Sequence, residues 1–385
     1  MDFIRHLYTA QYRLRERLTV LNCLLTQRPP SAETLPGPPR EVAFVLVGML
    51  GDTIMCLPVL EVAREIWPGA KLCAIVTPRI REMLKGVEYI DEFVIGTADP
   101  MSIRGRDKVV ETEERLKSHR FEVAILLGGD QYAPLFYRLG VPVRVGPQEC
   151  VYRPLFTHAY SIRGAFDWGP DERLNSIRVL GFQVKERVPR LEVEPTARAE
   201  INGWLSNKGL PPGAEYVVIH AFGSEPRKWW PPQRVTEVAR QLHSETGAYS
   251  LLVGGPECAD AARDVPTFSG LINAVGELGL TYLLALIGSA RLVISTDSGP
   301  YHMAGALGRP ILGLFAERRP KHAHRYPQGQ VVFGDDESCY NRCDYTRCQG
   351  VLCRQLDALS TEQVVAAAKR MLQKEAPKRF YQTSD

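Results

Sequence analysis

The segment 295–304 has the residue types and the spacing that best fit anion binding. A buried strand is expected to end here, and a helix to begin with Pro300 in its first turn, where proline is favoured. Asp297 or Ser298 can cap this helix. Unpaired N–H groups at a helix start attract phosphate, so we expect a diphosphate site, although an ordinary capped helix would show the same pattern. Gly299 would let the backbone approach an anion closely, and His302 in the first turn could donate to it.

A second polar segment follows the expected strand Tyr216–His220. It places Arg227, Lys228 and two tryptophans directly before another helix. We interpret Lys228 as a cation that neutralises charge on a departing diphosphate. Trp229 and Trp230 fit a hydrophobic core equally well.

A carboxylate follows the first strand of the core. Asp52 stands after Gly51 at a helix start, where it could take a proton from an acceptor hydroxyl as general base. The alternative is that Asp52 only caps its helix. Pro58 lies within the same helix and predicts a kink.

Two glycine turns follow other strands. Gly254 opens the turn 254–257, in which Glu257 could accept hydrogen bonds from a ribose. The turn 128–130 is similar and carries Asp130. Neither turn has the GxGxxG pattern of dinucleotide-binding proteins, and a simple strand-to-helix turn explains each equally well.

The elements that position these residues alternate between strands and helices. Near-continuous apolar runs such as 42–47 and 311–315 predict buried parallel strands, and the segments between them predict helices. Two such series, separated by an irregular stretch at 148–190, predict an α/β protein with two facing Rossmann-like domains and a cleft between them. The expected divisions are a helical arm and linker (1–40), an acceptor domain (41–190), a nucleotide-sugar domain (191–335), a cysteine-rich loop (336–358) and a C-terminal helix and tail (359–385).

Length and charge restrict the class of protein. The chain has 385 residues, which suits two domains, and a formal net charge of +3, which gives no case for a nucleic-acid partner. Charged residues interrupt the N-terminal segment, so it is no signal peptide, and no apolar run is long enough to span a membrane. We expect a cytoplasmic protein, with attachment to the inner-membrane surface left open. Helix 1–27 could anchor there or pack on its own domain or a second subunit. We favour packing, because its basic face is short.

These motifs together resemble glycosyltransferase family 9, the ADP-heptose:lipopolysaccharide heptosyltransferase family, over roughly 41–372. The resemblance implies a GT-B fold and a metal-independent, inverting transfer from a nucleotide sugar, with ADP-heptose as the expected donor. It makes Asp52 the base. It places Lys228, Ser298, Gly299 and His302 at the diphosphate with Ser224 nearby, Glu257 at the ribose and Asp297 at the sugar hydroxyls. The family often has threonine where Ser298 stands, and the hydroxyl is kept.

The acceptor and two competing functions stay open. A lipopolysaccharide core sugar, a protein serine and a small molecule are all compatible with the sequence, and scattered arginines (Arg79, Arg104, Arg138, Arg153, Arg163) would favour an anionic acceptor if they lined the cleft. A sugar-nucleotide epimerase would share the two-domain shape. Asp52 at a helix start fits a transferase better. A non-catalytic nucleotide-sugar scaffold would not need both Asp52 and Lys228.

Four of the nine cysteines lie within fifteen residues near the C-terminus. Their C-x3-C-x4-C-x4-C spacing suggests a tetrahedral structural site for zinc or iron, remote from the sugar chemistry. Reduced thiols, or disulfides formed after purification, are the alternative. The cluster also resembles that of the autotransporter heptosyltransferases, a branch of the same family with an iron-binding finger and large oligomers, so a homo-oligomer is left open. The four are Cys339, Cys343, Cys348 and Cys353.

Overall fold

The computed structural model describes residues 2–26, 29–32, 34–35, 37–96, 107–162, 169–223, 226–316, 326–336, 339 and 353–373, with side chains omitted at 2–12 and 107–110. Its contacts divide the chain into two compact units, Met1–Pro189 and Arg190–Asp385. Each unit has its own sheet and its own hydrophobic core.

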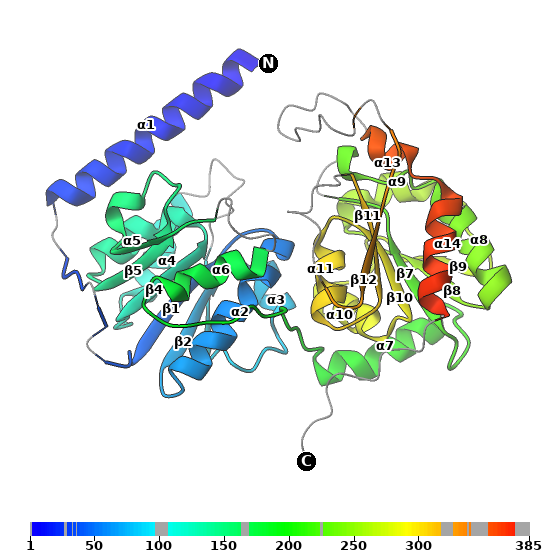
Figure 1. The fold of residues 1–385 in the computed structure, drawn as a ribbon, viewed down its shortest axis with the longest axis horizontal. Coiled ribbons are helices and arrows are strands. Elements are labelled where there is room, and N and C mark those ends of the chain that lie inside the picture. Colours follow the sequence, from blue (N-terminus) through cyan, green and yellow to red (C-terminus); the bar gives the residue numbers. More distant parts are fainter. Residues whose placement is uncertain are drawn as a thin grey trace. The chain divides into compact units, whose positions relative to one another are not determined.

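The first unit is a parallel six-stranded sheet with helices on both faces (Figure 1). Its strands are β1 (Glu41–Leu46), β2 (Lys71–Val76), β3 (Glu92–Ile95), β4 (Val123–Gly128), β5 (Val143–Pro147) and β6 (His158–Tyr160). Its helices are α1 (Asp2–Thr26), α2 (Leu50–Ile66), α3 (Pro78–Met83), α4 (Asp107–Leu116), α5 (Ala133–Arg138) and α6 (Gly169–Arg178), with short 3-10 turns η1 (Asp130–Tyr132) and η2 (Arg153–Leu155). The central strand β1 is buried because its apolar side chains are covered on both faces.

The second unit repeats this plan. Its strands are β7 (Tyr216–His220), β8 (Tyr249–Leu252), β9 (Leu271–Asn273), β10 (Leu292–Thr296), β11 (Ile311–Phe315) and β12 (Gly329–Phe333). Its helices are α7 (Pro195–Asn207), α8 (Arg234–Thr246), α9 (Ala259–Arg263), α10 (Leu280–Ser289), α11 (Gly299–Ala306), α13 (Arg354–Ala358) and α14 (Thr361–Leu372), with 3-10 turns η3 (Pro226–Lys228) and η4 (Pro256–Cys258). Helices α8 and α14 cover one face of the sheet, and α7, α10 and α11 cover the other (Figure 1).

Strand order identifies both sheets as Rossmann-like. The first runs β3-β2-β1-β4-β5-β6, and the second, read from the other edge, runs β9-β8-β7-β10-β11-β12. Both follow the 3-2-1-4-5-6 order of doubly wound sheets, in which ligands bind where the order reverses, beyond the carboxyl ends of the strands. In the second unit this switch point lies between β7 and β10. The predicted α/β class with two Rossmann-like units is therefore confirmed, and the predicted cleft and finer domain divisions stay predictions.

One expectation about the chain was wrong. The stretch 148–190, predicted to be irregular, contains β6 and α6, and β6 extends the first sheet by pairing in parallel with β5. The reason is length: β6 has three residues, too few to show an apolar period. For the same reason the sequence did not reveal β9, which also has three residues.

Candidate functional site

The switch point of the second unit brings together two predicted segments. Ser295 of β10 is the register partner of His220 of β7, and both are buried. Just beyond them, Ser298 Oγ lies 3.1 Å from His220 Nδ1 and 3.1 Å from Ser295 Oγ. Burial lowers the pKa of His220 to about 4, so its imidazole is neutral near pH 7. Sequence reasoning missed His220, although it is the last residue of a predicted strand that points into the site.

Helix α11 begins at this point with its first turn uncapped by a side chain. Ser298 is the N-cap residue in extended conformation, but its hydroxyl makes no capping hydrogen bond to the helix. It contacts His220 and donates within its own loop to the carbonyl of Thr296 instead. Gly299 is the first helical residue. The start of α11 therefore lacks the side-chain acceptor that usually satisfies its backbone donors, which is the arrangement that favours an anion.

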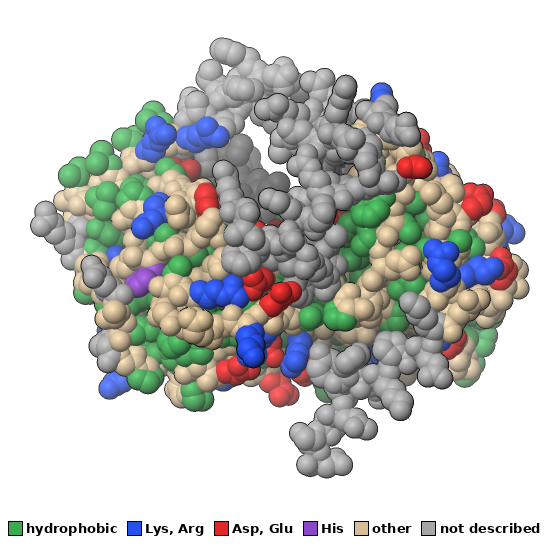
Figure 2. Space-filling model, in the orientation of Figure 1, with side chains coloured by type: hydrophobic (Ala, Val, Ile, Leu, Met, Phe, Trp, Pro, Cys, Tyr) green, Lys and Arg blue, Asp and Glu red, His purple; other side chains and the backbone are tan. Residues whose placement is uncertain are grey.

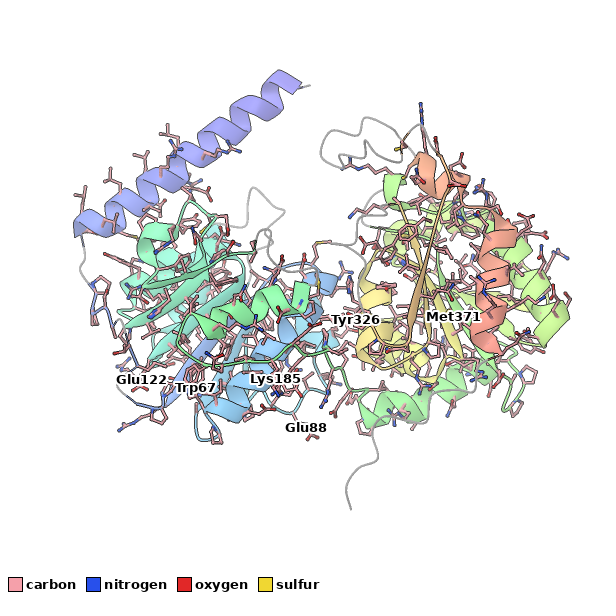
Figure 3. All side chains as sticks on the ribbon, in the orientation of Figure 1. Trp67, Glu88, Glu122, Lys185, Tyr326 and Met371 are labelled. Atoms are coloured by element: carbon pink, nitrogen blue, oxygen red, sulfur yellow. The ribbon has the colours of Figure 1, made fainter. Side chains whose placement is uncertain are left out.

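His302 lies one turn into α11 and is buried. Its Nδ1 is 3.1 Å from the hydroxyl of Tyr326, and its Nε2 is 3.9 Å from a carboxylate oxygen of the half-exposed Asp297. Tyr326 is itself buried against the same helix (Figure 3). His302 therefore lies between the side chains of Tyr326 and Asp297. Of these two neighbours, Asp297 is the more exposed.

The connection from β7 to α8 is fixed in place by aromatic packing. Trp230 is fully buried, and its indole N–H donates to the carbonyl of Leu359 at 3.0 Å. The indole N–H of Trp229 donates to the carbonyl of Gly223 at 3.1 Å. Trp230 therefore belongs to the hydrophobic core, and Trp229 holds the loop in place. This agrees with the interpretation of the tryptophans as core residues. Ser224 lies outside the described residues.

Lys228 is positioned by the same loop. A Cβ on Gly223 would lie 2.5 Å from the Cβ of Lys228, so only glycine allows this turn to close. The hydroxyl of Thr296 donates to the carbonyl of Phe222, which ties the end of β10 to the start of the loop. Lys228 is half-buried at the end of the η3 turn. The two segments predicted to share a diphosphate are therefore joined directly.

The glycine turn after β8 completes this edge of the sheet. Strand β8 pairs with β7, and a Cβ on Gly254 would approach the ring of Phe222 to 2.9 Å. The carboxylate of the exposed Glu257 lies over Gly255, where a Cβ would meet it at 2.3 Å. Four predicted donor-binding positions thus belong to adjacent strands β8, β7 and β10: Gly254, Glu257, Lys228 and Ser298.

Asp52 occupies the corresponding place in the first unit. It is exposed in the first turn of α2, and the N-cap of that helix is Met49, so Asp52 is not the capping residue itself. The side chain of Arg173, from α6, interacts electrostatically with Asp52. The Nε of Arg173 has no hydrogen-bond partner among the described residues. No sequence signal singled out Arg173, because its proximity to Asp52 arises only when α6 packs on α2.

Two of the other polar candidates of the first unit make hydrogen bonds or ion pairs within that unit. Arg138 pairs with Glu113, and Arg153 donates to the carbonyl of Phe156. Arg79 is exposed at the start of α3. Burial, followed by the charge of Glu16, raises the pKa of Asp130. Arg104 and Arg163 lie outside the described residues.

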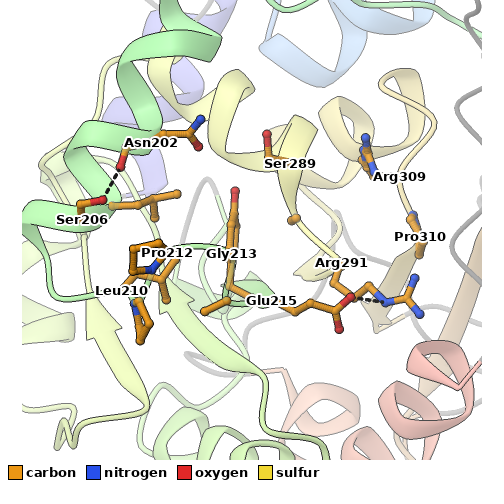
Figure 4. A pocket seen from close by; sticks show the side chains of 15 residues that line it. Asn202, Ser206, Leu210, Pro212, Gly213, Glu215, Ser289, Arg291, Arg309 and Pro310 are labelled. Atoms are coloured by element: carbon orange, nitrogen blue, oxygen red, sulfur yellow. Dashed lines mark hydrogen bonds and ion pairs between the residues drawn. The ribbon is translucent and has the colours of Figure 1, made fainter.

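One described cavity lies away from this edge. A cavity of about 540 Å³ lies at the amino end of the second sheet, between the α7–β7 connection and the starts of β10 and β11 (Figure 4). Its lining includes Glu215, Arg291, Arg309 and Pro310. Arg291 is compensated by Glu215 at 3.5 Å and donates to the carbonyl of Leu372. In doubly wound sheets ligands bind at the opposite, carboxyl edge, where the residues predicted to bind the donor lie.

The described residues include part of the cysteine cluster. Cys339 and Cys353 are partly buried, and Cys343 and Cys348 lie outside the described residues. Elsewhere, Cys73, Glu92 and His119 bring potential ligand atoms within 4.8 Å of one another. Lys71 already neutralises Glu92 at 2.6 Å, and His119 already pairs with Glu41 at 2.7 Å. We read this second group as an ion-pair network.

Comparison with known proteins decides the family. The model of glycosyltransferase family 9, the heptosyltransferase family, matches residues 109–351, more than half of the chain. The chain belongs to glycosyltransferase family 9. It is therefore a glycosyltransferase with a GT-B fold, and the epimerase and scaffold alternatives are set aside.

Three relatives illustrate how far the family 9 likeness extends. Lipopolysaccharide heptosyltransferase 1 of Pseudomonas aeruginosa is 25% identical over 316 residues, covering 77% of this chain and 84% of that protein. The structure of Escherichia coli ADP-heptose lps heptosyltransferase II has a TM-score of 0.71 at 17% identity, covering 86% of this chain and 98% of that chain. The iron-containing dodecameric glycosyltransferase TibC from enterotoxigenic Escherichia coli has a TM-score of 0.53 at 17% identity, covering 88% of this chain and 77% of that chain.

The helices of the described residues were compared with the requirements for a membrane span. Among the described residues, no helix combines the length and the apolar character needed to cross a bilayer.

Proposed function

We propose that this family 9 member transfers a heptose, with inversion, from ADP-heptose to an acceptor hydroxyl. The observation that supports this most is the junction of Ser298, His220 and the Lys228 loop at the switch point of the second sheet. Heptose is the proposed sugar because several relatives are heptosyltransferases. The nucleoside and the acceptor are proposals that rest on that family likeness.

The donor diphosphate would lie against the start of α11. Backbone donors of that first turn, the Ser298 hydroxyl and the Lys228 ammonium are the groups that would receive the charge as the bond to the sugar breaks. Neutral His220 can share a proton with Ser298 without adding a charge of its own. Asp297 and Glu257 would accept hydrogen bonds from sugar and ribose hydroxyls, because both carboxylates are exposed at the same edge. Gly299 would allow close approach, and Ser224 and His302 complete the proposed set.

Asp52 is the proposed general base. The carboxylate of Asp52 is exposed, so an acceptor hydroxyl can reach it, and the side chain of Arg173 from α6 interacts with it electrostatically. Inversion requires attack on the face of the sugar opposite the leaving diphosphate, as in inverting glycoside hydrolysis. The base must therefore approach the sugar from the face opposite the groups that hold the diphosphate. No group in this scheme requires a metal.

The experiment is a donor titration followed by a transfer assay. Calorimetry with ADP-heptose, ADP, UDP and GDP should show binding of the two adenine compounds only. Asp52→Asn should bind ADP-heptose as the wild type does and lose transfer to lipopolysaccharide core fragments or serine peptides, measured by mass spectrometry. Binding of UDP or GDP alone would refute ADP-heptose as donor. Unchanged transfer by Asp52→Asn would refute the base.

The cysteine cluster is proposed as a structural zinc or iron site. Support comes from the sequence spacing of Cys339, Cys343, Cys348 and Cys353. The structurally similar glycosyltransferase TibC, which contains iron, adds to it. Elemental analysis of protein purified under reducing conditions should find about one metal ion per chain, lost in Cys353→Ser and kept in Cys258→Ser, whose thiol is buried elsewhere. Metal-free wild type would refute the site. TibC is a dodecamer, so we also propose that this chain forms a homo-oligomer. Measuring the molecular mass of the same preparation in solution would test this.

A further inference from the structure

Helix α1 is docked on the first unit by one of its faces. Val20 and Cys23 are buried in the core of that unit. Glu16 is also buried, and its carboxylate accepts a hydrogen bond from the hydroxyl of Tyr152 at 2.9 Å. The contacts of α1 are with α5 and η2. The C-terminal half of α1 is therefore a fixed part of the unit rather than a loose arm.

The opposite face of α1 carries a stripe of exposed leucines. Leu14, Leu18, Leu21 and Leu25 have 59%, 55%, 50% and 76% of their surface exposed. Their spacing of four, three and four residues places all four on one side of the helix, away from Val20 and Cys23. In the sequence the same spacing continues toward the N-terminus at Phe3, Leu7 and Ala10. We call the four exposed leucines the leucine stripe.

The polar residues beside the leucine stripe are basic. Arg13, Arg15 and Arg17 are exposed and lie on the two flanks of the stripe. Glu16 is the one acidic residue in the sequence between Phe3 and Ala32, and it is buried under the helix. The described outward side of α1 thus combines apolar and cationic side chains. Figure 2 shows apolar and basic side chains adjoining along the described part of α1.

We propose that α1 lies flat on an anionic lipid bilayer, with the leucine stripe inserted among the headgroups and acyl chains. A narrow apolar face flanked by arginines has the form of an interfacial helix, since arginine can extend its guanidinium to phosphate while its stem stays apolar. The arginines make an anionic surface favourable. Because α1 is not long and apolar enough to span the bilayer, it would lie in its plane.

Charge favours a bilayer over a second copy of this chain. In a paired helix the flanking arginines of the two copies would face each other and repel.

The test is cosedimentation of the full chain with lipid vesicles. Wild type should pellet with phosphatidylcholine vesicles that contain phosphatidylglycerol, much less with phosphatidylcholine alone, and less at high salt. Leu18→Glu combined with Leu21→Glu should abolish pelleting. Leu24→Glu is the matched control, because Leu24 is exposed outside the stripe, and it should retain most binding. Arg13→Gln should weaken binding about fivefold.

Two results would overturn the proposal. One is equal pelleting of wild type and the Leu18→Glu, Leu21→Glu variant, provided that the melting temperatures of both show folded protein. The other is a wild-type dimer in sedimentation velocity without vesicles that becomes a monomer in that variant, because the leucine stripe would then be a contact between copies.

Discussion

At the scale of the residue, the burial of His220 beside Ser298 has a measurable effect on stability. Its burial lowers the pKa from 6.5 to about 4, so the unfolded chain binds a proton below pH 6.5 that the folded protein does not. The stability that neutral His220 supports is therefore complete above pH 6.5 and falls as pH drops toward 4, by roughly 3 kcal/mol. His220→Asn should flatten this part of the stability curve. Melting temperatures from pH 4 to 7 that fall in parallel for both proteins would contradict this account.

Lys228 carries the residue-scale prediction for binding. Hydrogen bonds to charged groups contribute about 1.5–3 kcal/mol, so Lys228→Ala should weaken ADP-heptose binding about tenfold to a hundredfold. Lys208→Ala is the control, because Lys208 pairs with Glu277 on the surface of the same unit. Calorimetry of the two variants checks the prediction. Equal affinities would place the diphosphate away from Lys228.

At the scale of the element, α11 depends on a glycine against an aromatic ring. A Cβ on Gly305 would lie 2.5 Å from the ring of Tyr326, so Gly305→Ala must displace the ring or the helix. We expect a loss of about 1–3 kcal/mol in unfolding free energy and weaker donor binding. Gly203→Ala, in α7 with nothing near the added methyl, should instead stabilise the protein. Thermal unfolding of the two variants separates the outcomes, and a neutral Gly305→Ala would show that α11 tolerates the shift.

The elements also show what the sequence could reveal. Apolar runs predicted β1, β7 and β11 to within a residue, because central parallel strands are apolar on both faces. The segments β6 and β9 were missed because three residues carry no period. Within the candidate site, residue type and spacing singled out Lys228 and Ser298, whose roles stay predictions. His220 and Arg173 were not, because their roles come from neighbours distant in sequence.

At the scale of the whole molecule, the chain repeats one architecture with different chemistry at each switch point. The second unit gathers hydroxyls, a lysine and an uncapped helix start, which suit a leaving diphosphate. The first unit presents the exposed carboxylate of Asp52, which an acceptor hydroxyl could reach. The first unit also carries α1, whose leucine stripe is exposed.

The central claim is that the donor binds at the carboxyl edge of the second sheet. A crystal structure of the protein with ADP-heptose tests it most directly. We predict the diphosphate at the start of α11, in contact with Ser298 and Lys228. A diphosphate in the cavity at the amino edge, beside Arg291 and Arg309, would contradict the account.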